Sequence, residues 1–204
     1  VPPNSIKRIE DLAKPEWKGR ICTRPGSHVY NRALLSSIVA ANGEKEAEKW
    51  ATAFVSNLAR RPQGNDRAQL KAISVGQCDV AIINHYYYGK LVNSEDAAQR
   101  EWVKDVSIIF PNQEAGDRGA HINISGGGIA KYSHNVKEAV KFLEFLVSPK
   151  AQSLYANINY EYPVIGGIVL PDTLTVWGEF KEDTVPIEKI ADLSAKTQMI
   201  IDRT

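Results

Sequence analysis

Two features of this sequence of 204 residues predict an α/β fold with a largely parallel sheet. Short apolar runs bounded by turn residues alternate along the chain with longer segments in which apolar side chains recur at helical spacing. Parallel strands need such crossovers, so this alternation is typical of a parallel sheet. The length is enough for one large domain or for two modest lobes, each with its own core.

Composition excludes several classes of function. The chain has 25 basic and 24 acidic side chains and no basic block, so we expect no nucleic-acid partner and no anionic membrane surface. No apolar run approaches the roughly 20 residues that a membrane helix needs. Residues 1–4 lack the basic start and apolar middle of a signal peptide, although an exported protein would look the same after processing.

The first half of the chain is predicted to contain two strands and three helices. A short strand at 20–23 stops at the Pro25-Gly26 turn, and a second strand spans 78–83. The helices are predicted at 29–41, beginning at Ser27 or His28, at 44–59, and from Asn65 or Asp66 to about 76, with Asp66 and Gln69 resembling a capping pair.

The second half is predicted to contain fewer regular elements. A polar helix is expected at 95–104, strands at 106–111 and 121–130, and helices at 135–147 and 149–157. The polar segment 112–119 is the predicted lobe boundary. In the less regular tail, weak strands are predicted at 162–164 and 168–170, followed by a last helix at 193–201.

Ligands of such sheets collect beyond the carboxyl ends of the strands. Two segments of this kind are 26–30 and 84–89, and the second contains three consecutive tyrosines, Tyr86, Tyr87 and Tyr88. Neighbouring side chains of a strand point to opposite faces, so Tyr86 and Tyr87 could serve one ion only if the backbone has turned out of the strand. Asn84 and Gly89, which flank the tyrosines, support such a turn.

Two interpretations of these tyrosines are possible. A free phenol titrates near pH 10, so it becomes an anionic ligand at neutral pH only when a strong Lewis acid such as Fe(III) displaces its proton. Softer metals call for Cys or His, and calcium calls for several carboxylates, which this stretch lacks. Alternatively, the triplet closes the top of a core, and Tyr30 is a half-buried surface residue.

A family resemblance supports the first reading. Residues 83–87 with Gly89 resemble the paired-tyrosine motif of the periplasmic ferric-ion-binding proteins, the substrate-capture components of iron(III) ABC importers, and especially of their cyanobacterial and marine members. Further blocks resemble the family in the family's order and cover most of residues 12–165: 17–20, 27–31, 42–43, 61–66, 110–113, 121–126, 142–146 and 148–149.

The resemblance implies a ligand set. The family's paired tyrosine ligands fall on Tyr86 and Tyr87, and a third ligand of the cyanobacterial type falls on Tyr30. Tyr88 stands where the motif usually has a packing residue. By the same resemblance, Gly26, Ser27, Asn65 and Asn84 are candidates to hold a synergistic anion, carbonate or phosphate, although plain helix capping explains such residues as well.

The histidines have lesser roles in this reading. His28 is a weak candidate for contact with Tyr30. His85 is expected to be a surface residue, because its family position varies. His121 is expected to belong to a strand returning to the other lobe.

The resemblance also implies the architecture, a periplasmic-binding-protein type II fold. Residues 1–111 would form the complete second lobe, and residues 112–204 the returning hinge strand and the C-terminal remainder of the first lobe. The N-terminal part of the family's first lobe has no counterpart in the sequence. Cys22 and Cys78 would lie near the starts of neighbouring strands, which predicts a disulfide in an oxidising periplasm.

The function implied is capture of Fe(III) between two lobes and delivery to an ABC permease of the inner membrane. The protein is expected to be periplasmic and, in its intact form, a monomer. An oxyanion-binding protein of the same fold is the alternative, with phosphate or sulfate held by the four anion candidates. An enzyme is not expected, because Ser125 lacks the preceding glycine of a nucleophile elbow and neither CxxC nor HExxH is present.

Overall fold

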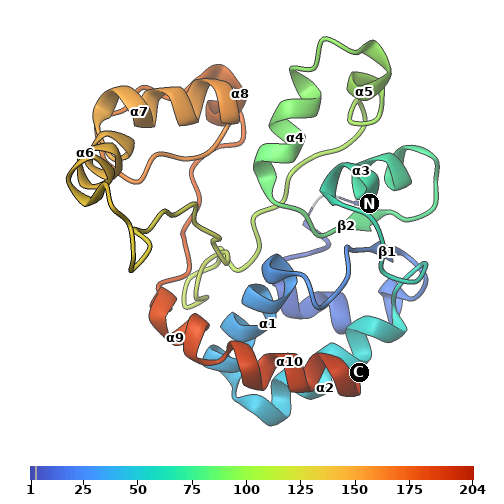
Figure 1. The fold of residues 1–204 in the computed structure, drawn as a ribbon. Coiled ribbons are helices and arrows are strands. Elements are labelled where there is room, and N and C mark those ends of the chain that lie inside the picture. The colour runs from blue at the N-terminus through green and yellow to red at the C-terminus, as the bar shows by residue number, and fades with distance from the viewer. Residues whose placement is uncertain (3) are drawn as a thin grey trace.

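The computed structural model describes residues 1, 2 and 4–204 as a helix-rich α/β structure (Figure 1). The elements of its first half are η1 (Ile9–Ala13), η2 (Pro15–Trp17), β1 (Ile21–Cys22), α1 (Val29–Asn42), α2 (Glu44–Ser56), α3 (Asp66–Ser74), β2 (Val80–Ala81), α4 (His85–Val92) and α5 (Ala97–Glu101). Those of its second half are α6 (Val136–Leu146), α7 (Pro149–Leu154), the π-helical turn η3 (Tyr155–Asn159), α8 (Asp172–Thr175), α9 (Ile187–Asp192) and α10 (Ser194–Arg203).

A small parallel sheet joins the two predicted strands of the first half. Ile21 of β1 pairs with Val80 of β2, and Cys22 pairs with Ala81. The structure joins Cys22 to Cys78 in a disulfide with the two Cα atoms 5.8 Å apart. Because the strands are parallel, their carboxyl ends lie at one edge, and the chain leaves that edge toward α1 and toward α4.

The main core lies between this sheet and the helices α1, α2 and α10. The predicted apolar face of α1 supplies Leu35, Ile38 and Val39, which pack with Ile21 and with Ile200 of α10. Helix α2 adds Ala47, Ala51 and Phe54 to the same cluster, which includes Trp17 of η2. The core therefore fixes the N-terminal end of α1 relative to the sheet.

The C-terminal helices pack against the first half of the chain. Helices α9 and α10 contact α1, and α10 also contacts α2 (Figure 1). The reason is burial, since Ile200 has no exposed area and Leu193 and Ile201 lie against the same cluster. Division of the chain into two lobes stays a prediction.

A second core supports α4. Leu70 of α3, Leu91 of α4 and Val103 are buried together, with Ile83 and Tyr88 packed against them. The Tyr88 hydroxyl donates a hydrogen bond to the carbonyl oxygen of Val106 at 2.8 Å. Tyr88 therefore anchors its helix, in agreement with the packing role expected for it.

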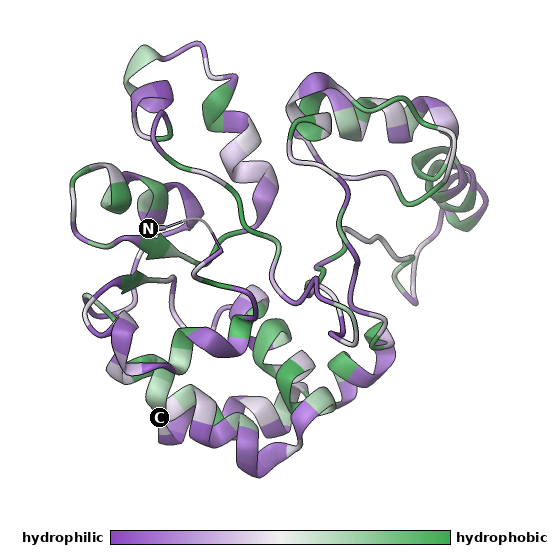
Figure 2. Cartoon of the chain, turned by 180° about the vertical axis from the view of Figure 1, so that it is seen from behind, coloured by the Kyte–Doolittle hydropathy of each residue, from purple (hydrophilic) through white to green (hydrophobic). Residues whose placement is uncertain are grey.

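Helices α6, α7 and α8 lie together at the upper left of Figure 1, and α8 meets the end of α4 through a hydrogen bond from Asn93 Nδ2 to Thr173 Oγ1 at 2.9 Å. Helix α6 has strongly amphipathic spacing but no buried residue. Its apolar side chains Val136, Val140, Phe142 and Phe145 are exposed. The hydropathy colouring in Figure 2 shows apolar positions on these helices as well as in the main core.

The strands expected at 106–111, 121–130, 162–164 and 168–170 are absent from the described part of the chain. An extended segment becomes a strand only when a neighbour supplies a ladder of hydrogen bonds, and these segments find little more than isolated bonds. Ala120, for example, forms a single parallel bridge with Glu182. The helices α4, α8 and α9 were not predicted.

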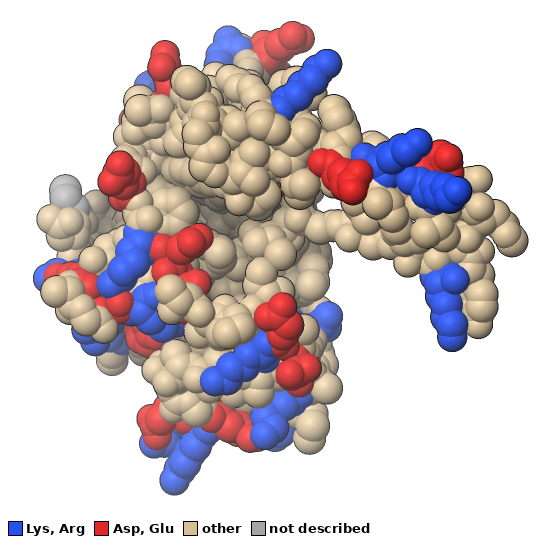
Figure 3. Space-filling view, turned by 90° about the vertical axis from the view of Figure 1, so that its left-hand side faces the viewer, with Lys and Arg blue, Asp and Glu red and all other residues tan. Residues whose placement is uncertain are grey.

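Charged side chains are mixed in sign over the face drawn in Figure 3, beside a broad area without charge. This agrees with the formal net charge of +1. Among the helices that the structure describes, none has the length and apolar character needed to span a bilayer.

Candidate metal centre

The tyrosine triplet lies in the first turns of α4, which begins at His85 directly after the strand region. The backbone has thus turned out of the strand, which is the geometry that a shared ligand role requires. The rings of Tyr86 and Tyr87 stack with centroids 4.3 Å apart and planes inclined by 30°. Two phenols that would diverge on a strand therefore lie on one side of a helix end.

Tyr30 reaches the same place from the N-terminus of α1. Its hydroxyl oxygen lies 3.2 Å from the hydroxyl oxygen of Tyr86, although 56 residues separate the two in sequence. Two oxygens that each lie about 2 Å from one small cation, roughly at right angles, are about 3 Å apart. The hydroxyls of Tyr30 and Tyr86 have a spacing of this kind, and the ring of Tyr87 lies beside that of Tyr86; these three side chains are called the phenol cluster.

The surroundings of Tyr86 disfavour loss of its proton in the absence of a cation. Burial raises the pKa of Tyr86 well above its usual range, and its hydrogen bonds with Tyr30 and Tyr87 raise it further. A cation that binds here as a tyrosinate complex must displace phenol protons, so its binding depends on pH. Only a strong Lewis acid can do this at neutral pH.

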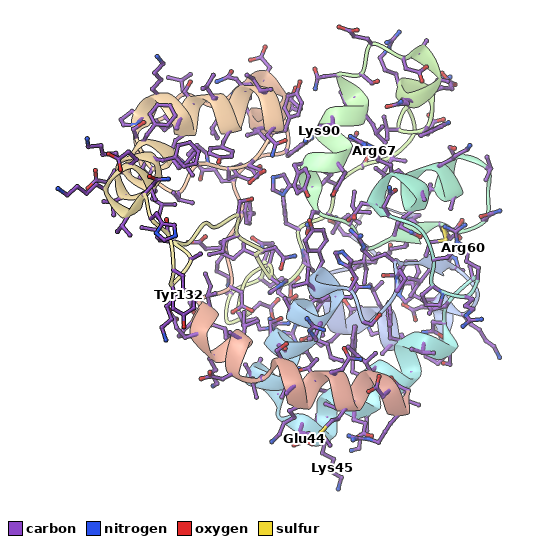
Figure 4. The ribbon with its side chains drawn as sticks, in the orientation of Figure 1. Glu44, Lys45, Arg60, Arg67, Lys90 and Tyr132 are labelled. Atoms are coloured by element: carbon purple, nitrogen blue, oxygen red, sulfur yellow. A yellow bond between two sulfur atoms is a disulfide. The ribbon has the colours of Figure 1, made fainter. Side chains whose placement is uncertain are left out.

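Each phenol ring carries a basic side chain on its face. The guanidinium carbon of Arg24 lies 4.9 Å from the Tyr30 centroid, Lys90 Nζ 5.2 Å from that of Tyr86, and the guanidinium carbon of Arg67 5.7 Å from that of Tyr87. Figure 4 shows Arg67 and Lys90 on the neighbouring helices α3 and α4. The three bases make the cluster's surroundings positive, which favours anions nearby.

Asp66 is the carboxylate closest to this arrangement. Its side chain is 1% exposed, forms an ion pair with Arg24, and accepts a hydrogen bond from the backbone N–H of Asn84 at 2.9 Å. The predicted capping pair of Asp66 and Gln69 is wrong, because Asn65 is the N-cap of α3 and accepts from the N–H of Ala68 at 3.1 Å.

The four anion candidates are not gathered as one group. Asn84 precedes α4 and its side-chain oxygen accepts from Asn123 Nδ2 at 3.0 Å, so it faces the opposite segment. Asn65 is exposed and occupied by its capping bond, Ser27 is exposed, and Gly26 lies against Ile201 of α10. Of the four, Asn84 is the one in contact with the cleft beside the phenols.

His85 is not the surface residue that was expected. Its ring lies 5.0 Å from that of Tyr162 and 5.8 Å from that of Trp177, and its Nε2 is buried. The first turn of α4 faces the 160–178 segment, and burial lowers the pKa of His85 to about 4. His85 therefore packs against Tyr162 and Trp177 at the start of α4.

The other two histidines also have defined places. His28 is the N-cap of α1, where its Nδ1 accepts from the N–H of Tyr30 at 3.3 Å and its ring meets the Tyr30 ring edge-on. It therefore contacts Tyr30, as expected. His121 belongs to no strand, and burial lowers its pKa to about 4.

A cleft of about 1190 Å³ opens beside the phenol cluster. Its lining includes Tyr30, Asn84 and Tyr86, apolar side chains of segments 6–12, 80–83, 106–110 and 120–127 and of α6, and the carboxylates of Asp66, Glu161 and Glu182. Within residues 1, 2 and 4–204, no group of three or more His, Cys, Asp or Glu side chains could hold a metal ion.

Sequence reasoning missed four residues of this region: Arg24, Asp66, Arg67 and Lys90. Lys90 had a usable signal, because it lies four residues after Tyr86 on the same helix. Arg24 and Asp66 are 42 residues apart and gave none.

An α/β fold in which phenols and bases meet at the edge of a parallel sheet, beside a cleft, is that of a solute-binding protein. The chain belongs to the family described as bacterial extracellular solute-binding protein, which it matches over residues 3–176. The predicted type II periplasmic-binding-protein fold is confirmed by the solved structures that it resembles.

The relatives are named for iron. The chain is 46% identical to "Iron uptake protein A1" of Synechocystis over 99% of its own length and 56% of that protein. It resembles "Ferric binding protein from Campylobacter jejuni" with a TM-score of 0.92 and 42% identity, over 97% of this chain and 62% of that one. A Trichodesmium protein solved in complex with iron and citrate gives a TM-score of 0.93 at 41% identity, over 100% and 64%. The chain thus spans about half the length of its curated relatives.

Proposed function

We propose that this chain captures Fe(III) through the phenol oxygens of Tyr30, Tyr86 and Tyr87, as part of the substrate-binding component of an iron(III) importer. The observation that carries the proposal is the 3.2 Å contact between the hydroxyls of Tyr30 and Tyr86, which come from two different helix starts. The names of the relatives favour iron over the oxyanion alternative. They also favour a binding role over an enzymatic one, since they are named as uptake and binding proteins.

Charge balance favours the ferric ion. Three tyrosinates carry three negative charges, which offset the charge of one Fe(III), and Fe(III) is a stronger Lewis acid than Fe(II), so it displaces the phenol protons more readily. Displacement of the phenol protons makes capture weaker as the pH falls, because the raised pKa of Tyr86 has to be overcome. Reduction to Fe(II) is expected to release the ion.

A synergistic anion fits the surrounding charges. Arg24, Arg67 and Lys90 surround the phenols, and Asp66 compensates only one of these charges. Carbonate or phosphate would complete the iron's coordination and balance the remaining bases. Asn84, at the cleft, is the anion candidate best placed to assist, and Gly26, Ser27 and Asn65 are more distant candidates.

The intact protein is proposed to close a second lobe over the iron. Relatives extend well beyond the matched region, and the exposed apolar face of α6 and the apolar cleft offer a surface for the segment that completes the first lobe. In this proposal the protein is a periplasmic monomer that delivers iron to an ABC permease of the inner membrane.

The test is titration with ferric citrate, followed by the visible charge-transfer band that tyrosinate gives with Fe(III). We expect one iron per chain, a weaker and shifted band in Tyr30→Phe, Tyr86→Phe and Tyr87→Phe, and an unchanged band in Tyr88→Phe. Tyr88 is the matched control because its hydroxyl bonds to Val106 on the other side of α4.

The contribution of the first lobe is measured with a second protein. This chain is joined to the N-terminal part of Iron uptake protein A1 that it does not cover, and both forms are titrated. Slower iron release from the joined form is expected, because closure replaces water ligands by protein. Absence of the band from both forms refutes the proposal, and retention of phosphate or sulfate instead supports the oxyanion alternative.

A further inference from the structure

The outstanding feature that the iron proposal leaves unexplained is the buried carboxylate of Asp66. Carboxylates are almost never fully buried unless paired, because desolvation of the charge is costly. Asp66 is 1% exposed and lies at the start of α3, where free backbone N–H groups favour a negative charge. Both of its oxygens are used, and each connects to a different half of the phenol cluster.

One oxygen connects Asp66 to Tyr30. Asp66 Oδ2 pairs with Arg24 Nη1, and the Arg24 side chain is only 12% exposed. The same guanidinium lies over the Tyr30 ring, with its carbon 4.9 Å from the ring centroid. The backbone of Arg24 is held too, because its carbonyl oxygen accepts from Asn31 Nδ2 of α1 at 2.8 Å.

The other oxygen connects Asp66 to the tyrosine pair. Asp66 Oδ1 accepts from the backbone N–H of Asn84 at 2.9 Å, and Asn84 is the N-cap of α4. Tyr86 and Tyr87 follow two and three residues later. The position of the Asn84 backbone therefore sets where the first turn of α4 begins, and with it where the two phenols lie.

We infer that Asp66 is a positioning residue that holds Tyr30 and the Tyr86–Tyr87 pair in register. It acts as a bridge from Arg24, which lies over one phenol, to the backbone that starts the helix of the other two. Neither Asp66 nor Arg24 is a ligand in this scheme. The inference rests on the proposed iron function for its effect on iron, but the bridge itself exists without iron.

A bridge and a simple charge effect give opposite predictions for Arg24. If only charge mattered, Asp66→Asn would make the site more positive and weaken Fe(III) retention, whereas Arg24→Gln would make it more negative and strengthen retention. If the bridge matters, both substitutions break it. Each is then expected to speed iron release about tenfold or more and to shift the charge-transfer band.

The bridge also predicts that the effects of substituting Asp66 and Arg24 on iron release are not additive. Once the bridge is broken by one substitution, the second removes little more, so the double variant is expected to release iron no faster than about twofold beyond the worse single variant. Arg24→Lys keeps a positive charge for the ion pair but not the guanidinium over the Tyr30 ring, and partial rescue is expected.

The chain contains a matched control in the exposed ion pair of Asp79 and Arg20. Asp79 Oδ2 pairs with Arg20 Nε at 2.6 Å, and the Arg20 guanidinium lies 5.0 Å from a ring centroid of the buried Trp17. These three residues repeat the aspartate, arginine and aromatic arrangement without a tyrosine of the phenol cluster, and the Arg20 and Asp79 side chains are 38% and 49% exposed. Asp79→Asn and Arg20→Gln are expected to leave iron release unchanged.

The experiment uses the full-length protein. It measures iron release to a chelator, the position of the charge-transfer band, and amide hydrogen exchange of the iron-free form. Exchange at residues 84–88 is expected to rise at least tenfold in Asp66→Asn while α2 stays unchanged, which separates local loosening from general destabilisation. Stronger retention in Arg24→Gln, or exchange at 84–88 unchanged in Asp66→Asn, overturns the inference. Absence of the band from the unsubstituted protein refutes the iron function, and hydrogen exchange still decides the role of Asp66.

Discussion

Loss of the disulfide between Cys22 and Cys78 should have a large effect on stability. The bond closes a loop between residues 56 apart and joins the two strands whose carboxyl ends lead to the phenols. In the chain-entropy model, opening a loop of this size costs about 4 kcal/mol at 25 °C, because the unfolded chain gains freedom while the folded pairing of Ile21 with Val80 is kept. Removal is therefore expected to act mainly through the unfolded state.

The assay is equilibrium unfolding in urea with and without reductant. At a slope of about 2–3 kcal/mol per molar, a loss of about 4 kcal/mol lowers the midpoint by about 1.5 M. Reduction keeps both sulfur atoms, so this shift is free of the cavity that Cys22→Ala and Cys78→Ala would add at two buried positions. The double alanine variant should be insensitive to reductant.

A midpoint that moves by less than about 0.5 M on reduction would refute the entropic reasoning, since the slope converts this to only about 1 kcal/mol. That result would mean that the unfolded chain already keeps β1 and β2 near each other. An unchanged midpoint combined with faster iron release would instead place the effect of the bond in the folded sheet edge.

Three further outcomes are expected from unfolding measurements. Ile200→Ala should lower the free energy of unfolding by about 2–5 kcal/mol, because this side chain of α10 is completely buried against α1 and α2. Met199 is 60% exposed, so Met199→Ala should change the free energy of unfolding little. Equal effects of the two substitutions would contradict the packing of α10. Gly89→Ala should lower the free energy of unfolding by about 1–3 kcal/mol, because a Cβ there would lie 2.8 Å from the Cβ of Tyr160. An unchanged free energy of unfolding would show that Tyr160 can move aside. The pKa of His121 is lowered to about 4 in the folded chain, so protonation of this residue favours the unfolded chain. The free energy of unfolding should therefore fall between pH 6.5 and pH 4 by on the order of 1–3 kcal/mol. His121→Gln should flatten that part of the pH profile.

Local sequence determined the longer helices α1, α2 and α6 and the pair Tyr86 and Tyr87. The apolar spacing of residues 29–41, 44–59 and 135–147 predicted α1, α2 and α6 to within a few residues, because a helix is built from contacts three and four residues apart. Tyr86 and Tyr87 were found because they are adjacent in a motif, and Tyr30 was found through the family resemblance.

Tertiary structure alone decided the features that join distant segments. The strands predicted at 106–111 and 121–130 depend on a neighbour that no local pattern supplies, and α10 lies on α1 because Ile200 finds its burial there. The ion pair of Asp66 with Arg24 spans 42 residues, and its second hydrogen bond reaches backbone rather than a side chain. The sequence by itself thus determined which residues can offer phenol oxygens, and the packing of the folded chain decided that they lie 3.2 Å apart and what holds them there.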